Sequence, residues 1–216
     1  MTDSTVDFLH TTRSSYDAIA KDYAERFPSG LPHPLDRSLI SAFAELVTEN
    51  GPAPVADLGS GPGFVTGLLD SLGVPVFGVD LSPAMVALAR EAHPHLRFHV
   101  GSMTALDLPD ATLGGILALY STIHVPDDAL ARAFAEFHRT LRPGAPVLLA
   151  FQTGDADHLH LTERFGHEID LDYWMRSPAA IASGLTEAGL TLVASMVREP
   201  QGDEARPRGF VLARKE

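Results

Sequence analysis

The chain has 216 residues, of which 45% are hydrophobic and 20% charged, as expected for one globular domain with a sizeable core. Its formal net charge of −12 argues against nucleic acid and against an anionic membrane surface as partners, because both bind lysine and arginine. Cysteine is absent, which excludes disulfides and thiolate chemistry, and without a signal-peptide pattern at 1–10 or an apolar run of about 18 residues we expect a cytoplasmic protein.

Two helices are predicted before the first strand. Apolar residues recur at helical spacing in Thr2–Phe27 and again in Leu35–Val47, with a connector rich in proline and glycine at Pro28–Pro34 between them. We expect a single domain over residues 1–216, in which residues 1–50 form a helical cap.

Five short apolar runs alternate with helical patterns in the middle of the chain. The strands are predicted at Val55–Leu58, Val74–Val79, Leu96–Val100, Leu113–Leu119 and Ala145–Ala150. The helices are predicted from the glycine-rich segment to Leu72, at Pro83–Ala92 and at Pro126–Leu141. This alternation predicts an α/β fold with a parallel sheet and right-handed crossovers.

The last third of the chain departs from this alternation. Residues 151–172 are mostly polar, with scattered apolar residues, and predict a flexible loop. A helix at Pro178–Ala188 precedes two β-rich segments, Leu190–Val197 and Gly209–Ala213, which predict a closing antiparallel pair. The five basic residues of Arg198–Lys215 are interrupted by acidic ones, so we expect a solvated surface there.

A glycine-rich segment follows the first predicted strand. Asp57 is succeeded by Gly59, Gly61 and Gly63 at alternate positions, and a helical pattern then begins. Glycine lacks Cβ, so it lets a ligand approach the backbone and permits positive φ, and ligands of open α/β sheets bind at this strand edge. The spacing G-x-G-x-G differs from the dinucleotide fingerprint G-x-G-x-x-G, whose sixth position is Phe64 here.

Asp80 ends the second predicted strand, where a carboxylate can accept hydrogen bonds from both ribose hydroxyls. Asp80 could instead cap the next helix, but Ser82, which precedes Pro83, suits that position better. The glycine segment and Asp80 together predict a nucleoside-binding edge of the sheet.

The acid and the three glycines of Asp57–Gly63 resemble the D/E-x-G-x-G-x-G loop of class I S-adenosylmethionine (SAM)-dependent methyltransferases. The resemblance covers Tyr16–Ala213, and Arg139–Gly144 is similar to the R-x-L-R-P-G-G turn of quinone and natural-product methyltransferases, with Ala145 replacing the last glycine. It implies a Rossmann-like methyltransferase sandwich, with a mostly parallel seven-stranded sheet and a C-terminal antiparallel hairpin. It also implies SAM as cofactor, S-adenosylhomocysteine (SAH) as product, and a substrate lid at 152–176.

The resemblance further implies which residues contact the cofactor. They are Tyr16, Tyr23, Asp57, Gly59, Ser60, Gly61, Gly63, Asp80, Leu81, Ser82, Met85, Gly101, Ser102, Met103 and Tyr120. Tyr16 and Tyr23 match a Y-D-x-x-A-x-x-Y segment whose tyrosines help close the cofactor pocket, although both could simply pack their helix. Ser102 stands where many relatives carry an aspartate that receives the adenine amino group, so a hydroxyl or backbone atom would make that contact here.

Methyl transfer has a good leaving group, so the enzyme supplies mainly positioning and desolvation. A general base is needed only for a protonated nucleophile. His124, just beyond the fourth predicted strand, is the candidate base, because imidazole titrates near neutral pH. Its alternative role is a pocket wall or a cofactor contact.

Four further residues are predicted to contact the substrate together with His124, namely His158, His160, His167 and Trp174. The histidines with Glu168 or Asp170 could instead form a two-histidine-one-carboxylate metal site, but a polar loop is more often solvated or substrate-lining, and we predict no metal. Trp174 could equally pack in the core.

We therefore predict methyl transfer from SAM to an O, N or C nucleophile of a small molecule, by a monomer or a homodimer. Two alternatives stay open. One is a protein that binds SAM without transferring its methyl group, in a cyclase-like or structural use. The other is a NAD-dependent oxidoreductase, which the glycine spacing and the closing antiparallel pair oppose.

Overall fold

The computed structural model describes residues 4–27, 31, 33–154 and 158–216. The predicted first helix is α1, Ser4–Arg26. The start of that prediction and most of the predicted connector lie outside the described residues.

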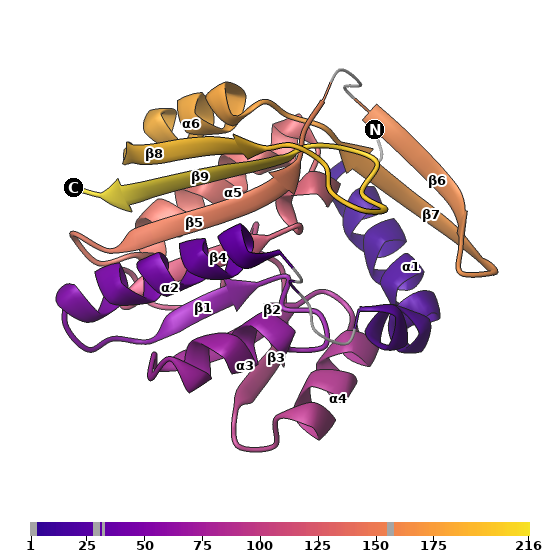
Figure 1. The fold of residues 1–216 in the computed structure, drawn as a ribbon, viewed down its shortest axis with the longest axis horizontal. Helices are drawn as coiled ribbons and strands as arrows, with labels where there is room; N and C mark the ends of the chain where they lie inside the picture. The colour runs from indigo at the N-terminus through magenta and orange to yellow at the C-terminus, as the bar shows by residue number, and fades with distance from the viewer. Residues whose placement is uncertain (1–3, 28–30, 32, 155–157) are drawn as a thin grey trace.

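Seven strands form one sheet in the order β3-β2-β1-β4-β5-β9-β8 (Figure 1). Their bounds are β1 Val55–Leu58, β2 Val76–Asp80, β3 Arg97–Val100, β4 Gly115–Leu119, β5 Pro146–Gln152, β8 Leu190–Arg198 and β9 Arg208–Lys215. The first five are parallel to one another, whereas β9 is antiparallel to both β5 and β8. The predicted fold class, a mostly parallel seven-stranded sheet with a closing antiparallel pair, is confirmed.

Helices cover both faces of the sheet. They are α2 Pro34–Glu49, α3 Phe64–Ser71, α4 Pro83–Ala92, α5 Asp127–Thr140 and α6 Pro178–Glu187, with a short 3₁₀ helix, η1, at Thr122–His124. In β4 the side chain of Leu117 packs with α2 and α3, whereas Ile116 and Ala118 pack with α5 and α6. The central strands are therefore buried on both faces, which explains their continuous apolar runs.

Three helices begin at a proline that directly follows a capping residue. The caps accept a backbone N–H of the first turn at 3.1–3.2 Å, and they are His33 before Pro34, Ser82 before Pro83 and Ser177 before Pro178. Proline suits this position because its missing N–H has no intrahelical partner there. Ser82, rather than Asp80, is thus the helix cap.

A second sheet replaces the loop predicted at 151–172. It is a hairpin of β6, His158–Arg164, and β7, His167–Trp174, and it lies against α1 beyond the carboxyl ends of the parallel strands (Figure 1). The loop prediction was wrong because one face of each strand is polar, so the apolar residues appear scattered. Phe165 and Gly166, with φ of 54° and 81°, form the two-residue turn.

The inner face of this hairpin completes the core around α1. Ile169, Leu171 and Tyr173 of β7 are buried in the same core cluster as Ile19 of α1. Ser15 of α1 ties the two elements together, because its Oγ donates to the Asp170 carbonyl at 2.9 Å and accepts from the Asp170 N–H at 3.0 Å. The segment expected to be a lid is therefore a packed hairpin.

Candidate active site

The three glycines of the loop between β1 and α3 all have positive φ, between 52° and 87°, which favours glycine. A Cβ on Gly59 would stand 2.2 Å from the Cβ of Ser121, in the segment after β4. A Cβ on Gly63 would stand 2.9 Å from the ring of Phe98. A Cβ on Gly61 would meet nothing within 4 Å, so this glycine faces open space.

Asp80 binds the loop from the end of β2. Its Oδ2 accepts the Gly61 N–H and its Oδ1 accepts the Ser82 N–H, both at 2.8 Å. Each carboxylate oxygen keeps a free lone pair toward the space above Gly61. Burial raises the pKa of Asp80 to about 6, and the two backbone hydrogen bonds oppose that rise.

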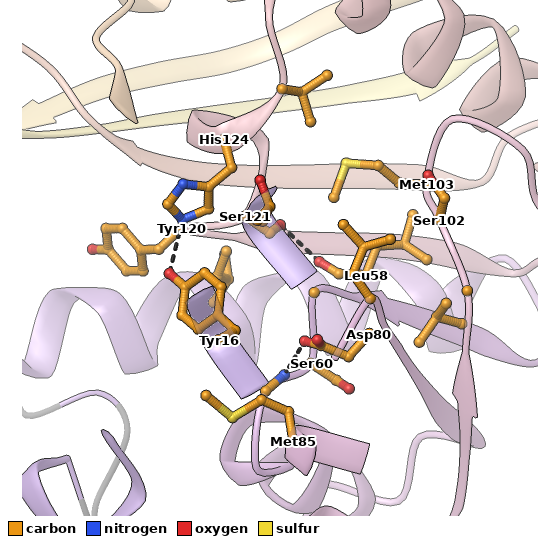
Figure 2. A pocket seen from close by; sticks show the side chains of 18 of the residues that line it. Tyr16, Leu58, Ser60, Asp80, Met85, Ser102, Met103, Tyr120, Ser121 and His124 are labelled. Carbon is orange, nitrogen blue, oxygen red and sulfur yellow. Dashed lines mark hydrogen bonds between the residues drawn. The ribbon is translucent and has the colours of Figure 1, made fainter. Parts of the chain in front are cut away.

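A pocket opens at this strand edge. Thirteen of the residues predicted to bind a ligand line it, namely Tyr16, Tyr23, Gly59, Ser60, Gly61, Asp80, Leu81, Met85, Gly101, Ser102, Met103, Tyr120 and His124. Figure 2 shows the pair formed by Tyr16 and His124 across the pocket from Ser102 and Met103.

Three residues predicted to contact the cofactor do not line the pocket. Asp57 is buried and accepts a hydrogen bond from Thr66 Oγ1 at 2.6 Å, and burial raises its pKa to about 7. Gly63 packs against Phe98, and Ser82 Oγ donates to Asp17 Oδ1 at 2.6 Å while capping α4. Asp57, Gly63 and Ser82 therefore support the glycine loop and Asp80 without lining the pocket.

Ser102 and Tyr120 occupy two further walls of the pocket. The hydroxyl of Ser102 lies 2.8 Å from that of Thr104 and accepts the Thr104 N–H at 3.2 Å, so it belongs to a local turn. Tyr120 has a φ of 54°, and the guanidinium carbon of Arg208 lies 5.7 Å from its ring centroid. Burial raises the pKa of Tyr120 and keeps its phenol neutral.

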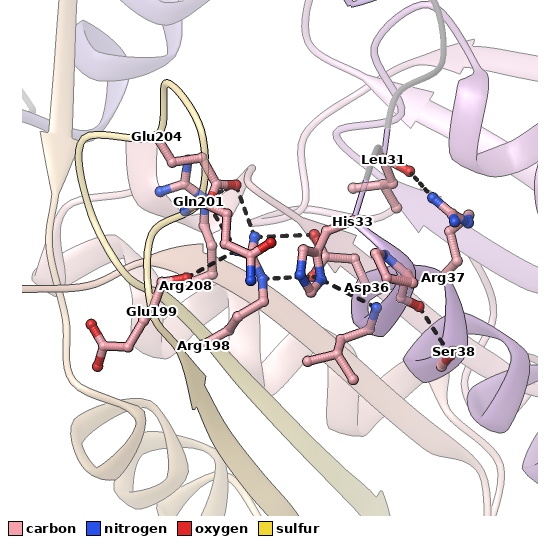
Figure 3. Close-up of polar contacts among 12 residues, drawn as sticks. Leu31, His33, Asp36, Arg37, Ser38, Arg198, Glu199, Gln201, Glu204 and Arg208 are labelled. Atoms are coloured by element: carbon pink, nitrogen blue, oxygen red, sulfur yellow. Dashed lines mark hydrogen bonds and ion pairs between the residues drawn. The ribbon is translucent and has the colours of Figure 1, made fainter.

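A buried ion-pair cluster acts electrostatically on Tyr120, in a segment where the sequence predicts a solvated basic surface. Figure 3 shows this cluster, which contains Asp36, Arg198, Glu204 and Arg208. Arg198 is 5% exposed and its Nε contacts Asp36 Oδ1 at 3.1 Å, while its Nη1 contacts Glu204 Oε2 at 2.7 Å. Arg208 lies 3.6 Å from the same glutamate. The expectation was wrong for Arg198 because its acidic partners come from α2 and from the loop between β8 and β9.

His124 lies in η1, is 5% exposed, and uses both ring nitrogens. Its Nδ1 lies 2.8 Å from the backbone oxygen of Asp172, and its Nε2 lies 2.8 Å from the hydroxyl of Tyr16. Burial lowers the pKa of His124 to about 4, so the ring is neutral at pH 7. A carbonyl can only accept, so Nδ1 carries the proton and Tyr16 donates to Nε2.

None of the four residues predicted to contact the substrate from the 151–176 region lines the pocket. His158 and His160 lie 2.7 and 2.9 Å from the carboxylate of Asp172. His167 pairs with Asp22 at 2.9 Å, and the ring of Trp174 lies against that of His158. Within the described part of the chain, no group of three or more histidines, aspartates or glutamates is arranged to hold a metal ion.

Sequence reasoning predicted Tyr16 and Tyr23 of α1 at the pocket but missed three further lining residues of this helix, Phe8, Leu9 and Thr12. Phe8, Thr12 and Tyr16 recur every four residues and all line the pocket, together with Leu9. The spacing i, i+4, i+8 marks one helix face and could have indicated this set. Leu31 before α2 is a further lining residue that carried no signal in the sequence.

The fold and the pocket define a nucleoside-binding α/β domain, and comparison with known proteins narrows this class. Residues 55–144 match the family model described as a methyltransferase domain. N-demethylindolmycin N-methyltransferase of Streptomyces griseus is 33% identical over 148 residues, which are 63% of this chain and 60% of that protein. Demethylmenaquinone methyltransferase of Chlorobaculum parvum is 33% identical over 91 residues, which are 42% of this chain and 37% of that protein.

A solved structure agrees over almost the whole chain. The DhpI–SAH complex has a TM-score of 0.73 at 22% identity, and the match covers 99% of this chain and 98% of that one. Residues 55–144 form a methyltransferase domain, and the whole chain has the fold of SAM-dependent methyltransferases. It spans only 37% to 60% of the length of the two curated relatives. Among the described residues, no helix combines the length and the apolar character that crossing a membrane requires.

Proposed function

We propose that this chain transfers a methyl group from SAM to a small molecule. The observation that carries the proposal is the half-buried carboxylate of Asp80, which faces the open space above Gly61 with free lone pairs. A ribose with two adjacent hydroxyls fits this arrangement, since each hydroxyl can donate to one carboxylate oxygen. The pocket also offers an apolar wall at Met103 for a purine ring.

When bound, SAM would supply an electrophilic methyl group on a sulfonium with a good leaving group. The contribution of the chain is then to bind the nucleoside through Asp80 and to let it approach the backbone at Gly61. Tyr16 and Tyr23 of α1 close the pocket, and the mostly apolar lining around them excludes water. Methyl transfer depends mainly on how the reactants are positioned, and a pocket covered by a helix can hold them in place.

The matched relatives favour methyl transfer over the two alternatives drawn from the sequence. Both curated relatives are named as methyltransferases, one for demethylmenaquinone and one for N-demethylindolmycin. We extend only the general class, a small-molecule acceptor, to this chain. The net charge of −12 supports a small molecule over a nucleic acid.

Thermal unfolding with SAM, SAH and NADH tests the cofactor class. A ligand at about 100 times its Kd should add about 2.7 kcal/mol, or roughly 5–10 °C in Tm for a domain of this size. We expect this shift with SAM and SAH and none with NADH. Asp80→Asn should abolish most of it, whereas Asp70→Asn, on α3 outside the pocket, should keep it.

Two results would contradict the proposal. One is the absence of any shift with SAM and SAH, and the other is a shift with NADH equal to theirs. With SAH binding established, release of SAH from SAM in the presence of candidate acceptors would identify the acceptor.

A further inference from the structure

The pocket wall opposite Ser102 contains one polar pair in mostly apolar surroundings. The pair is Tyr16 and His124; of the neighbouring lining residues, Phe8, Leu9 and Val125 are apolar and Thr12 carries a hydroxyl. In Figure 2 the hydroxyl of Tyr16 points toward His124 and away from Asp80, so the hydrogen-bonded end of the pair can face the second substrate rather than the ribose.

The direction of the hydrogen bonds determines what this pair can offer. The Asp172 carbonyl takes the Nδ1 proton of His124, and the Tyr16 hydroxyl donates to Nε2. The imidazole therefore has no free polar atom in this arrangement. The proton of the Tyr16 hydroxyl is already used in the hydrogen bond to His124, so Tyr16 can offer a ligand only the lone pairs of its oxygen.

The β6–β7 hairpin holds the pair in this state. Tyr173 is close enough to share a hydrogen bond with Tyr16, and Arg164 of β6 donates to the Tyr173 hydroxyl. The Tyr173 proton can occupy one lone pair of Tyr16, which leaves the other for a ligand. His124 and the hairpin thus position Tyr16, and both ring nitrogens of His124 are already used in doing so.

The charges around the pair favour an uncharged ligand. Asp80 is the one aspartate, glutamate, lysine or arginine among the described residues that line the pocket. The ionisable groups that act on Tyr16 and His124 are Tyr23 of α1, Asp80 of β2, and Arg164, Asp172 and Tyr173 of the hairpin. Burial raises the pKa of Tyr16 and lowers that of His124, so neither supplies a positive charge at pH 7. Arg164, the cation that acts on the pair, donates to the Tyr173 hydroxyl and does not line the pocket, so a buried carboxylate ligand would find no lysine or arginine on the wall itself.

We propose that the Tyr16 oxygen, held by His124, receives a hydrogen bond from the methyl acceptor, so that the acceptor is an uncharged hydroxyl or amine compound and not a carboxylate. The inference rests on the proposed function, because it assigns the second half of the same pocket. Tyr16 is then the residue that determines specificity, and His124 is a positioning residue rather than the base that contacts the acceptor.

Binding of small aromatic probes to the SAH-loaded protein tests this assignment without knowledge of the true acceptor. The probes are phenol, aniline, anisole and benzoate, and the readouts are their Kd values and the ¹⁵N shifts of labelled His124. We expect phenol and aniline to bind about three- to tenfold more tightly than anisole, because only they can donate to Tyr16. Benzoate should bind at least about tenfold more weakly than phenol. Phenol should also shift the Nε2 resonance of His124.

Variants separate the hydroxyl from the shape of the site. Tyr16→Phe should make phenol and anisole bind equally, whereas Ser14→Ala, which removes an exposed hydroxyl of the same helix outside the pocket, should keep the preference for phenol. His124→Gln, whose carbonyl can accept the Tyr16 proton, should preserve more of that preference than His124→Leu. SAH affinity, measured in each variant, reports whether the pocket is still folded.

The outcomes separate this inference from the proposed function. If SAH binds but benzoate binds as well as phenol, or no probe binds, or the preference survives Tyr16→Phe, this inference is overturned and the proposed function stands. If SAH itself does not bind, both are overturned.

Discussion

The two sides of the pocket are built in different ways. The glycine-loop side comes from one continuous stretch, in which β1, the loop and Asp80 follow one another within residues 55–80. The opposite side is assembled from distant segments, since Tyr16 meets His124 across 108 positions and Ser15 meets Asp170 across 155. The first side works through backbone shape, and the second through side-chain hydrogen bonds.

Because the two sides are built differently, we expect them to respond differently to substitutions. A continuous loop is fixed by its own φ angles and by the absence of Cβ atoms, so one added methyl group can disturb it. An assembled side depends on partners that must all be present, so loss of one leaves buried polar groups unsatisfied. The predictions below break one side at a time, from the largest expected effect to the smallest.

The largest effect on stability is expected at the buried ion-pair cluster of Asp36, Arg198, Glu204 and Arg208. Asp36→Leu would leave Arg198 buried with only part of its compensation, and we expect a loss of about 3–5 kcal/mol in the free energy of unfolding. Denaturant titration measures this loss. The double variant Asp36→Leu with Arg198→Met should be less damaging than the single one, because no buried charge is then left without its partner. A loss below about 1 kcal/mol in the single variant would mean that the pair is solvated.

The glycine loop offers the sharpest contrast within the continuous side. Gly59→Ala would force its Cβ against Ser121 at a positive φ, and we expect a loss of about 3 kcal/mol in stability. Gly61→Ala meets no neighbour, so only its backbone strain, about 1–2 kcal/mol, should reduce stability. Its added methyl group enters the pocket and should weaken SAH binding. Equal stability losses in the two variants would refute the separate roles assigned to these glycines.

The same contrast between a continuous side and an assembled side explains which parts of the structure could be predicted from the sequence. The alternation of strands and helices, the glycine loop and Asp80 were predictable, because their signals are local in sequence and their spacing is set by one supersecondary unit. The hairpin at 158–174 was not, because polar outer residues hide an alternation of period two. The Asp172 carbonyl at His124 and the burial of Arg198 were also missed, since a backbone atom carries no residue type and distant ion pairs leave no local pattern.

The pH dependence of stability tests Asp57, which belongs to the continuous side of the pocket. Burial raises the pKa of Asp57 to about 7 in the folded protein, well above the ordinary value of 3.8. The folded state then holds a proton that the unfolded state releases, so stability is highest below about pH 4 for this group and falls as the pH rises toward 7. Asp57→Asn should flatten this part of the curve and stabilise the protein at pH 8 by roughly 2 kcal/mol. An unchanged slope in the variant would show that other groups cause the pH dependence.

The smallest effect is expected where the hairpin meets α1. Ser15→Ala removes two hydrogen bonds to the backbone of Asp170. The Ser15 hydroxyl donates one of them to the Asp170 carbonyl and accepts the other from the Asp170 N–H. The expected loss is about 1–2 kcal/mol, because the Asp170 N–H and carbonyl are left without their partner. Hydrogen exchange should show faster exchange of β7 amides, with the amides of β1 unchanged. Ser14→Ala, one position earlier and exposed, is the matched control. If β1 also exchanged faster, the two sides would form one cooperative unit, and their different construction would have no consequence for stability.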